Sequence, residues 1–219
     1  MSWLIAETIG EHVALLTEAE VRHLRSVRRE RPGRAVGIID GQGTRARGIW
    51  RGDHQVEIEC IERFRPSGIR VAIGLGSRES NEESLRRAAE LGAEEILPML
   101  TRRSRDAGAA RKPPNVDRWQ RILESGCAQS GNPWFPRLAD CAAWDELRAD
   151  WTAPGHVVCA PGGRPLVEFG QDIRAIAIGP EGGFVEDEIA GLQRVGLGRW
   201  ILRTPVAVAV ALGTMEQAA

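Results

Sequence analysis

The sequence predicts an α/β protein with two domains, a small β-barrel over residues 1–66 and a mostly parallel sheet domain over residues 67–219. Short segments rich in β-branched residues and separated by glycines fill the first part of the chain, which is the pattern of a small barrel. From Ile69 onward, strand-like and helical segments alternate, which is typical of a parallel sheet. The polar sequence RFRPSG at residues 63–68 separates the two patterns and marks the domain boundary. A chain of 219 residues is long enough to bury two modest cores.

The first domain contains four segments with the composition of strands: WLIAE (3–7), RAVGIID (34–40), TRARGIW (44–50) and QVEIECI (55–61). Glycines that can form the turns between them are Gly33, Gly41, Gly43 and Gly52. One helix is expected to interrupt the strands. It would begin at Thr17, because Glu20 follows three residues later and completes a capping box.

The second domain is expected to hold the strands IRVAIGL (69–75), EEILPML (94–100), HVVCA (156–160), RAIAIG (174–179) and GRWIL (198–202). Between them the sequence predicts the helices NEESLRRAAELG (81–92), NVDRWQRILESGCAQSG (115–131) and GFVEDEIAGLQRVG (183–196). A last helix of small residues would begin at Thr204 as its N-cap, with Pro205 at the favoured first helical position. The Val-Ala alternation that follows is also compatible with a strand.

Composition excludes several classes of protein. The hydrophobic content of 42% is ordinary for a globular chain, and no window approaches the roughly 18 consecutive apolar residues of a membrane span. The N-terminus lacks the features of a signal peptide, so a cytoplasmic location with no membrane partner is expected. The cysteines are widely spaced and form no CxxC pair, so we expect reduced thiols and neither a disulfide framework nor a metal site at Cys60, Cys127, Cys141 and Cys159.

The net charge of -1 hides an uneven distribution of arginines. One basic run consists of Arg22, Arg25, Arg28, Arg29, Arg31 and Arg34, and a second of Arg102, Arg103, Arg105, Arg111, Lys112, Arg118 and Arg121. Either run could be no more than a solvated, arginine-rich surface. Read as functional sites, the runs would neutralise nucleic-acid phosphates, which the planar guanidinium binds in a bidentate way. If about six phosphates were contacted, affinity would fall by roughly 10³-fold from low to moderately high salt.

Two loops of the second domain have unusual composition. Gly179-Pro180-Glu181-Gly182-Gly183 follows a predicted strand, and glycines there would let main-chain groups approach a ligand closely. The alternative is that these residues form a simple strand-to-helix turn. The second loop lies within LGRWILRTPVAVAVALG (197–213). Both loops would follow strands of one parallel sheet, where carboxyl ends form a ligand crevice. Other nucleotide motifs fail, because GLGSRE at 74–79 lacks the third glycine of GxGxxG and the chain has no Walker loop and no GxSxG.

At these loops the sequence resembles the ribosomal RNA small subunit methyltransferase E family of the SPOUT methyltransferases. The resemblance rests on IGPEGGF..DEI followed by LG..ILRT, and it continues upstream in HLRSVRRERPGRAVGIIDGQG (23–43), RRAAELGAEEILPMLTRRS (86–104) and RWQRILESGCAQSGNPWFP (118–136). It implies a PUA-like N-terminal barrel that binds RNA and a SPOUT domain with a trefoil knot. It also implies a homodimer that uses S-adenosyl-L-methionine (SAM) to methylate N3 of a uridine in small-subunit (16S) ribosomal RNA, free or in the assembled subunit.

The resemblance also implies roles for individual residues. The cofactor would be held by Ala160, Pro161, Gly179, Pro180, Glu181, Gly182, Gly183, Leu197, Gly198, Ile201, Leu202 and Arg203. Arg203 would also place the uridine or a phosphate, against the alternative of a structural ion pair. Glu181 is a candidate proton acceptor, although a role in pinning its own loop is favoured. RNA would be bound by Arg22, Arg25, Arg28, Arg29, Arg87, Arg102, Arg103 and Arg105.

The chain departs from the family pattern at several positions. The family usually reads LRTETA where this chain reads LRTPVA, so Pro205 and Val206 replace a glutamate and a threonine. Ala128 and Asn132 replace the Glu and Arg of EQSGR, and Arg87 stands where a lysine is common. Two alternatives follow: a catalytically weak RNA-binding relative, or a SAM-dependent methyltransferase that acts on another RNA.

Overall fold

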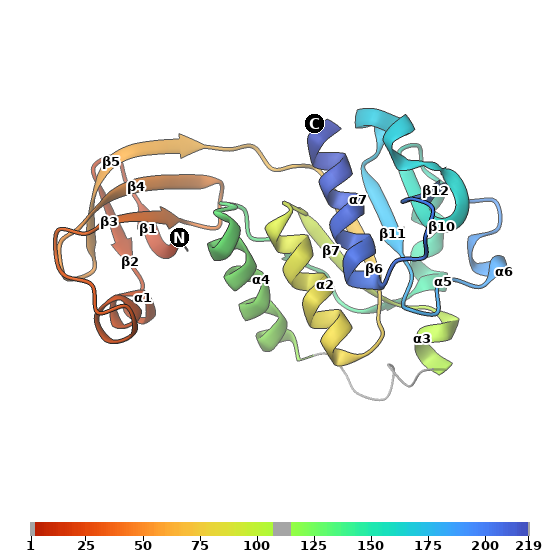
Figure 1. The fold of residues 1–219 in the computed structure, drawn as a ribbon, viewed down its shortest axis with the longest axis horizontal. Coiled ribbons are helices and arrows are strands. Elements are labelled where there is room, and N and C mark those ends of the chain that lie inside the picture. Colours follow the sequence, from red (N-terminus) through yellow and green to blue (C-terminus); the bar gives the residue numbers. More distant parts are fainter. Residues whose placement is uncertain (1–2, 107–114, 219) are drawn as a thin grey trace. The chain divides into compact units, whose positions relative to one another are not determined.

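The computed structural model describes residues 3–106 and 115–218 and divides the chain into two compact units (Figure 1). The first unit comprises Met1–Pro66 with Glu124–Phe135, and the second comprises Ser67–Leu123 with Pro136–Ala219. One division falls after Pro66, inside the polar connection. The sequence analysis placed Glu124–Phe135 in the second domain. In the structure this segment belongs to the compact unit of the barrel.

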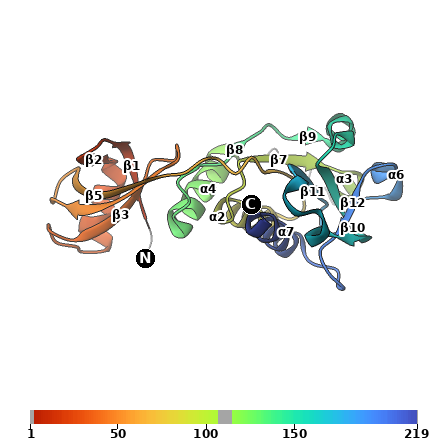
Figure 2. The same ribbon diagram turned by 90° about the horizontal axis from the view of Figure 1, so that it is seen from above.

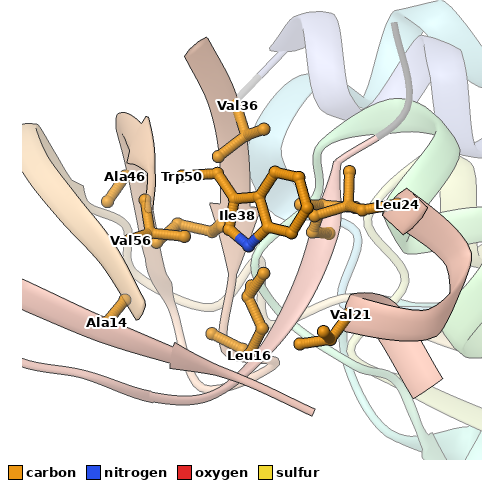
Figure 3. Close-up of a cluster of buried hydrophobic side chains, with 11 residues drawn as sticks. Ala14, Leu16, Val21, Leu24, Val36, Ile38, Ala46, Trp50 and Val56 are labelled. Carbon is orange, nitrogen blue, oxygen red and sulfur yellow. The ribbon is translucent and has the colours of Figure 1, made fainter. Parts of the chain in front are cut away.

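The first unit is built on a closed barrel with the strand order β1-β2-β5-β4-β3. The strands are β1 (Leu4–Ile9), β2 (Val13–Leu16), β3 (Ala35–Ile39), β4 (Thr44–Trp50) and β5 (Gln55–Arg63). The parallel pair β1 and β3 closes the barrel, and the other pairs are antiparallel. Alternate side chains point inward, so Leu16, Ile38, Trp50 and Val56 form the barrel core (Figure 3). The short strand β2 escaped the sequence prediction because four residues carry little periodic signal.

A helical segment connects β2 to β3. Helix α1 (Glu18–Arg22) begins at Thr17, whose hydroxyl accepts a hydrogen bond from the Glu20 backbone N at 3.3 Å. The expected reciprocal half of the capping box is wrong, because the Glu20 carboxylate instead accepts from the backbone N of Ile5 at 3.3 Å. A turn of π-helix, η1 (His23–Val27), continues α1 directly.

The second unit contains a parallel sheet in the order β12-β10-β11-β6-β7-β8, with β9 beside β7. Its strands are β6 (Arg70–Gly74), β7 (Glu95–Leu100), β8 (Arg137–Leu138), β9 (Ala142–Ala143), β10 (His156–Pro165), β11 (Ala175–Ile178) and β12 (Arg194–Gly196). The central strands are buried on both faces, which explains why RVAIG and AIAI read as nearly continuous apolar runs. The carboxyl ends of β6, β10 and β11 therefore meet at one edge of the sheet.

Helices cover both faces of this sheet. Helices α2 (Arg78–Glu90) and α7 (Thr204–Ala218) pack side by side and lie on one face, as Figures 1 and 2 show. On the other face, Trp144 and Trp151 pack against Ala72, Ala175 and Ala177. The remaining helical segments are α3 (Arg102–Asp106), α4 (Val116–Ser130), α5 (Trp144–Leu147), η3 (Arg148–Thr152), η4 (Leu166–Asp172) and α6 (Glu186–Ile189).

Two expectations for the segment after β11 are wrong. The helix expected over 183–196 is limited to α6, because Gly191 has a φ of 77° and the chain then enters β12. The strand expected over 198–202 is an irregular loop, in which Gly198 has a φ of 146°. The helix expected from Thr204 is confirmed as α7. Among the residues that the structure describes, no helix is long and apolar enough to span a membrane.

Candidate cofactor site

The two glycine-containing loops enclose a cavity of about 500 Å³ at the carboxyl ends of the sheet strands. Every residue that the family resemblance assigned to the cofactor lines this cavity except Arg203: Ala160, Pro161, Gly179, Pro180, Glu181, Gly182, Gly183, Leu197, Gly198, Ile201 and Leu202. Further lining residues that the sequence did not assign to the cofactor include Arg103, Cys159, Gly162, Phe184, Trp200 and Thr204. The prediction that the two loops converge is therefore confirmed.

The loop from Gly179 to Gly183 is a tight turn that follows β11. The backbone N of Gly183 donates to the Pro180 carbonyl at 2.7 Å, and Gly183 has a φ of 70° that favours glycine. A Cβ at position 179 would lie 3.0 Å from the Gly183 backbone, so the turn closes tightly only with glycine. The Thr204 hydroxyl, itself buried, donates to the Gly179 carbonyl at 3.1 Å. This bond joins the first loop to the start of α7.

The end of β6 packs directly against the same turn. A Cβ at Gly74 would lie 2.4 Å from both the Cδ and the N of Pro180, so glycine is needed for the loop to rest on this strand. A Cβ at Gly76 would lie 2.1 Å from Oε2 of Glu181. The Glu181 carboxylate therefore lies against the Gly76 backbone while its residue also lines the cavity.

Glu188, which the sequence analysis assigned no role, holds the far end of this loop. Its carboxylate is buried and accepts from the backbone N of Arg102 at 2.8 Å and of Val185 at 2.9 Å. Its main-chain oxygen accepts from Trp144 Nε1 at 2.9 Å and from Arg148 Nε at 3.0 Å. The only signal for it in the sequence is its place three residues after Val185, the N3 position of a short helix.

The second loop, residues 197–203, presents apolar side chains at the cavity. Trp200 is 73% exposed and Ile201 is 87% exposed, and both line it. Arg203 is exposed and does not line the cavity. Within the described residues the Arg203 side chain forms no ion pair with an acidic residue. The alternative role of Arg203 as a partner in a structural ion pair therefore finds no support in this part of the chain.

The second basic run reaches this site. Nη1 of Arg103 donates to the Gly182 carbonyl, and the Arg103 side chain packs against Gly182. Arg102 pairs with Asp187 through its Nη1 at 3.4 Å. Arg87 forms ion pairs with Glu83 at 2.6 Å and Glu90 at 2.9 Å on its own helix. The side chain of Arg105, and residues Arg111 and Lys112, lie outside what the structure describes.

The first basic run lies in the barrel unit. Arg22, Arg25 and Arg29 are exposed on or directly after α1 and η1, and Arg25 donates to the Gly52 carbonyl. Arg28 is half-buried, and its Nε donates to His23 Nε2 at 3.1 Å. This run therefore presents several cations to solvent.

At the cavity wall, the pKa values of one ion pair and one thiol are shifted. A hydrogen bond from Arg194 lowers the pKa of Glu186, and both residues line the cavity. Burial raises the pKa of the Cys159 thiol to about 11, so this lining residue is a neutral thiol at pH 7. Within the described ranges, no cluster of His, Cys, Asp or Glu side chains could hold a metal ion, and the four cysteines form no disulfide.

Comparisons with known proteins agree with this geometry. A protein named ribosomal RNA small subunit methyltransferase E from Synechocystis sp. is 29% identical to this chain over 233 residues, which cover 96% of this chain and 75% of that relative. A protein of the same name from Mycobacterium bovis is 29% identical over 226 residues, which cover 93% of this chain and 86% of that relative. The crystal structure of such a protein from Neisseria gonorrhoeae bound to S-adenosyl methionine superposes with a TM-score of 0.78 at 26% identity, over 99% of this chain and 97% of that one.

The small barrel and parallel sheet predicted from the sequence patterns, and the SPOUT-type domain that the resemblance implied, are confirmed by this likeness and by the strand topology. The family model described as an RNA methyltransferase domain matches residues 64–216. The chain therefore belongs to the RNA methyltransferase domain family, as its resemblance to ribosomal RNA small subunit methyltransferase E proteins predicted.

Proposed function

We propose that this chain is a SAM-dependent methyltransferase that modifies N3 of a uridine in 16S ribosomal RNA. The observation that carries the proposal is the cavity between the Gly179–Gly183 turn and the 197–203 loop. Two further facts support it. The relatives that align with nearly the whole chain are named ribosomal RNA small subunit methyltransferase E, and the relative of known structure at 26% identity was crystallised with SAM.

The residues present fit SAM. A volume of about 500 Å³ lies within the range of roughly 300–1,000 Å³ of small-molecule sites. Apolar side chains such as Pro161, Leu197 and Leu202 would cover the adenine and the methionine chain. The main chain at Glu181 and Gly182, the exposed residues of the 179–183 turn, would bind the polar edges of the cofactor. When bound, SAM supplies an electrophilic methyl group on its sulfonium.

The chain itself would position the acceptor and accept its proton. Holding uridine N3 and the SAM methyl carbon about 3–3.5 Å apart lowers the activation barrier by about 7–11 kcal/mol. This alignment is the main contribution of the two loops. Uridine N3 must lose a proton, and Glu181 is a lining carboxylate that could accept it. Its contact with Gly76 supports the other role, in which it fixes the loop. Arg203, exposed beyond the cavity lining, would bind the uridine or a phosphate from outside.

The RNA would be bound by the two basic runs. Arg22, Arg25, Arg28 and Arg29 belong to the barrel unit, Arg103 lines the cavity, and Arg102 precedes it in the chain. Arg103 would then have two tasks, since it also holds the Gly182 carbonyl. The proposed substrate places the protein in the cytoplasm with the ribosome.

A homodimer is part of the proposal. Val206 and Val210 lie one turn apart on α7 and are exposed, and Trp200 and Ile201 precede them in the chain. Exposed apolar side chains on one face of a helix, such as Val206 and Val210, are typical of an interface. Light scattering with size-exclusion chromatography should give a dimer for the unaltered chain and for Val116→Arg, an exposed valine on α4, and a monomer for Val210→Arg. Equal masses for all three proteins would refute this interface.

The substitutions at Pro205 and Val206 do not weaken the proposal. Thr204 and Ala207 line the cavity, whereas Pro205 and Val206 do not. Helix α7 begins at Thr204, so Pro205 lies in its first turn, where no backbone donor is needed and the helix begins normally. The altered positions therefore leave the proposed cofactor contacts in place.

Two measurements test the proposal. Calorimetry should detect SAM binding to the purified chain, and its absence would leave an RNA-binding relative without catalysis. Methyl transfer should then occur to small ribosomal subunits that lack the modification. Transfer to another RNA but not to these subunits would favour the second alternative. Arg203→Ala should bind SAM normally and transfer methyl groups slowly, and unaltered transfer would exclude its role at the acceptor.

A further inference from the structure

A second cavity lies in the barrel unit, in the segment that joins η1 to β3. Its volume is about 350 Å³, and its lining combines apolar residues, Leu24 and Val36 among them, with Arg28, Glu30 and Arg34. Leu24 and Val36 belong to the barrel core, as Figure 3 shows, so buried apolar side chains lie beneath the cavity. A concave apolar floor with a few polar groups at the rim is the usual form of a small-ligand site.

The backbone around this cavity is unusual in two ways. The segment His23–Val27 forms a turn of π-helix, a conformation that is rare and frequent at functional sites. Arg29 then takes a φ of 53°, a left-handed conformation that glycine or asparagine normally occupies at a helix end. Arg29 is the one described non-glycine residue with a positive φ. At this helix end the backbone N of Glu30 donates to the Leu24 carbonyl at 3.0 Å, which places Glu30 beside the cavity.

The charges at the rim suit one nucleotide. Arg28 lies along the wall, where its Nε donates to His23 Nε2 at 3.1 Å, and the exposed Arg34 offers a guanidinium group for a phosphate or for stacking on a base. Arg34 Nε lies 3.6 Å from Oε2 of Glu30, within reach of an ion pair but beyond hydrogen-bond distance. Arg34 therefore attracts the Glu30 carboxylate toward the cavity without forming a hydrogen bond to Oε2 through its Nε. Oε2 of Glu30 can then accept a hydrogen bond from a ligand.

We propose that this cavity binds one unpaired nucleotide of the RNA substrate and that Glu30 selects guanine there. A carboxylate accepts hydrogen bonds only, and guanine presents two adjacent donors, N1–H and the N2 amino group, that match its two oxygens. Uracil presents one N–H between two carbonyl acceptors, which a carboxylate repels. The inference rests on the proposed RNA binding and adds a base-specific contact that phosphate neutralisation cannot supply.

The test compares fluorescently labelled single-stranded RNA decamers, oligouridine and the same strand with one central guanine, by anisotropy with the full chain. The unaltered chain should bind the guanine strand about tenfold more tightly. Glu30→Gln should weaken binding of that strand and abolish the preference, although the loss of a negative charge should by itself tighten binding. Ala35→Trp, which fills the cavity with an apolar ring, should also abolish the preference and leave the salt dependence unchanged.

Arg31→Ala is the matched control, because Arg31 is exposed on the same segment and does not line the cavity. It should weaken both strands alike and reduce the salt slope by about one. Equal affinity of the unaltered chain for both strands, or tighter binding by Glu30→Gln, would overturn the pocket and leave the proposed methyl transfer standing. Failure to bind either strand would overturn RNA recognition by the barrel as well, and SAM calorimetry would still report separately on the second unit.

Discussion

The buried carboxylate of Glu188 offers a quantitative test of how the cofactor loop is held. In Glu188→Ala, the backbone N–H groups of Arg102 and Val185 lose the acceptor that they reach at 2.8 and 2.9 Å. Hydrogen bonds to a charged group contribute about 1.5–3 kcal/mol each, so the two together set an upper range of about 3–6 kcal/mol. Arg102 is exposed, and water can reach its N–H once the side chain is removed. We therefore expect a loss of about 3 kcal/mol in the free energy of unfolding.

Urea denaturation followed by circular dichroism measures this loss, and calorimetry with SAM measures its effect on the site. Asp187→Ala is the matched control, because Asp187 is a neighbouring acid that is 81% exposed and pairs only at the surface with Arg102. Surface pairs of this kind contribute below about 1 kcal/mol. If Glu188→Ala lost no more stability than the control and bound SAM equally well, the carboxylate would not be the element that fixes the loop.

The remaining predictions concern a glycine, an ion-pair network and the thiols. Gly74→Ala should displace Pro180 and slow methyl transfer by about 10²-fold. Gly213→Ala is the control, because its added methyl group meets no atom within 4 Å, and it should transfer methyl groups at the normal rate. Equal rates for the two variants would show that β6 does not support the loop. Hydrogen bonds from Arg118 and Arg78 lower the pKa of Glu82 to about 2, so its stabilising effect is complete above the unfolded-state pKa of about 4.3 and is lost as the pH falls through the folded value. Glu82→Gln should accordingly unfold at lower urea concentration than the unaltered chain at pH 7, with a smaller difference at pH 3, and a constant difference would contradict this. Iodoacetamide at pH 8 should modify the exposed Cys60 well before Cys159, whose pKa burial raises to about 11; equal labelling would mean that Cys159 is accessible and ionised.

Local patterns in the sequence were sufficient to predict most of the architecture. Alternation of apolar strands with amphipathic helices predicted the parallel sheet, and Thr204-Pro205 predicted the start of α7. The glycines of the 179–183 turn pointed to the cofactor loop because close backbone approach needs residues without a Cβ. In each case the determining interaction lies within a few residues of the pattern.

The failures arose where distant contacts decide the structure. The strand preference of Trp200 and Ile201 is overridden, since the segment leaves the sheet after Gly196 and lines the cavity instead. The bond from Arg103 to Gly182 and the bond from Arg102 to Glu188 join positions about eighty residues apart, and no periodicity reveals them. Arg103 was accordingly predicted to bind RNA, although the structure also places it at the cofactor loop.

Nucleoside analysis of small-subunit ribosomal RNA by mass spectrometry tests the central claim most directly. In a strain that lacks this protein, 3-methyluridine should be absent from that RNA; re-expression of the unaltered chain should restore it, and Gly74→Ala should restore it poorly. An unchanged 3-methyluridine content in the strain without the protein would contradict the claim that this cavity supplies the methyl group to the ribosome.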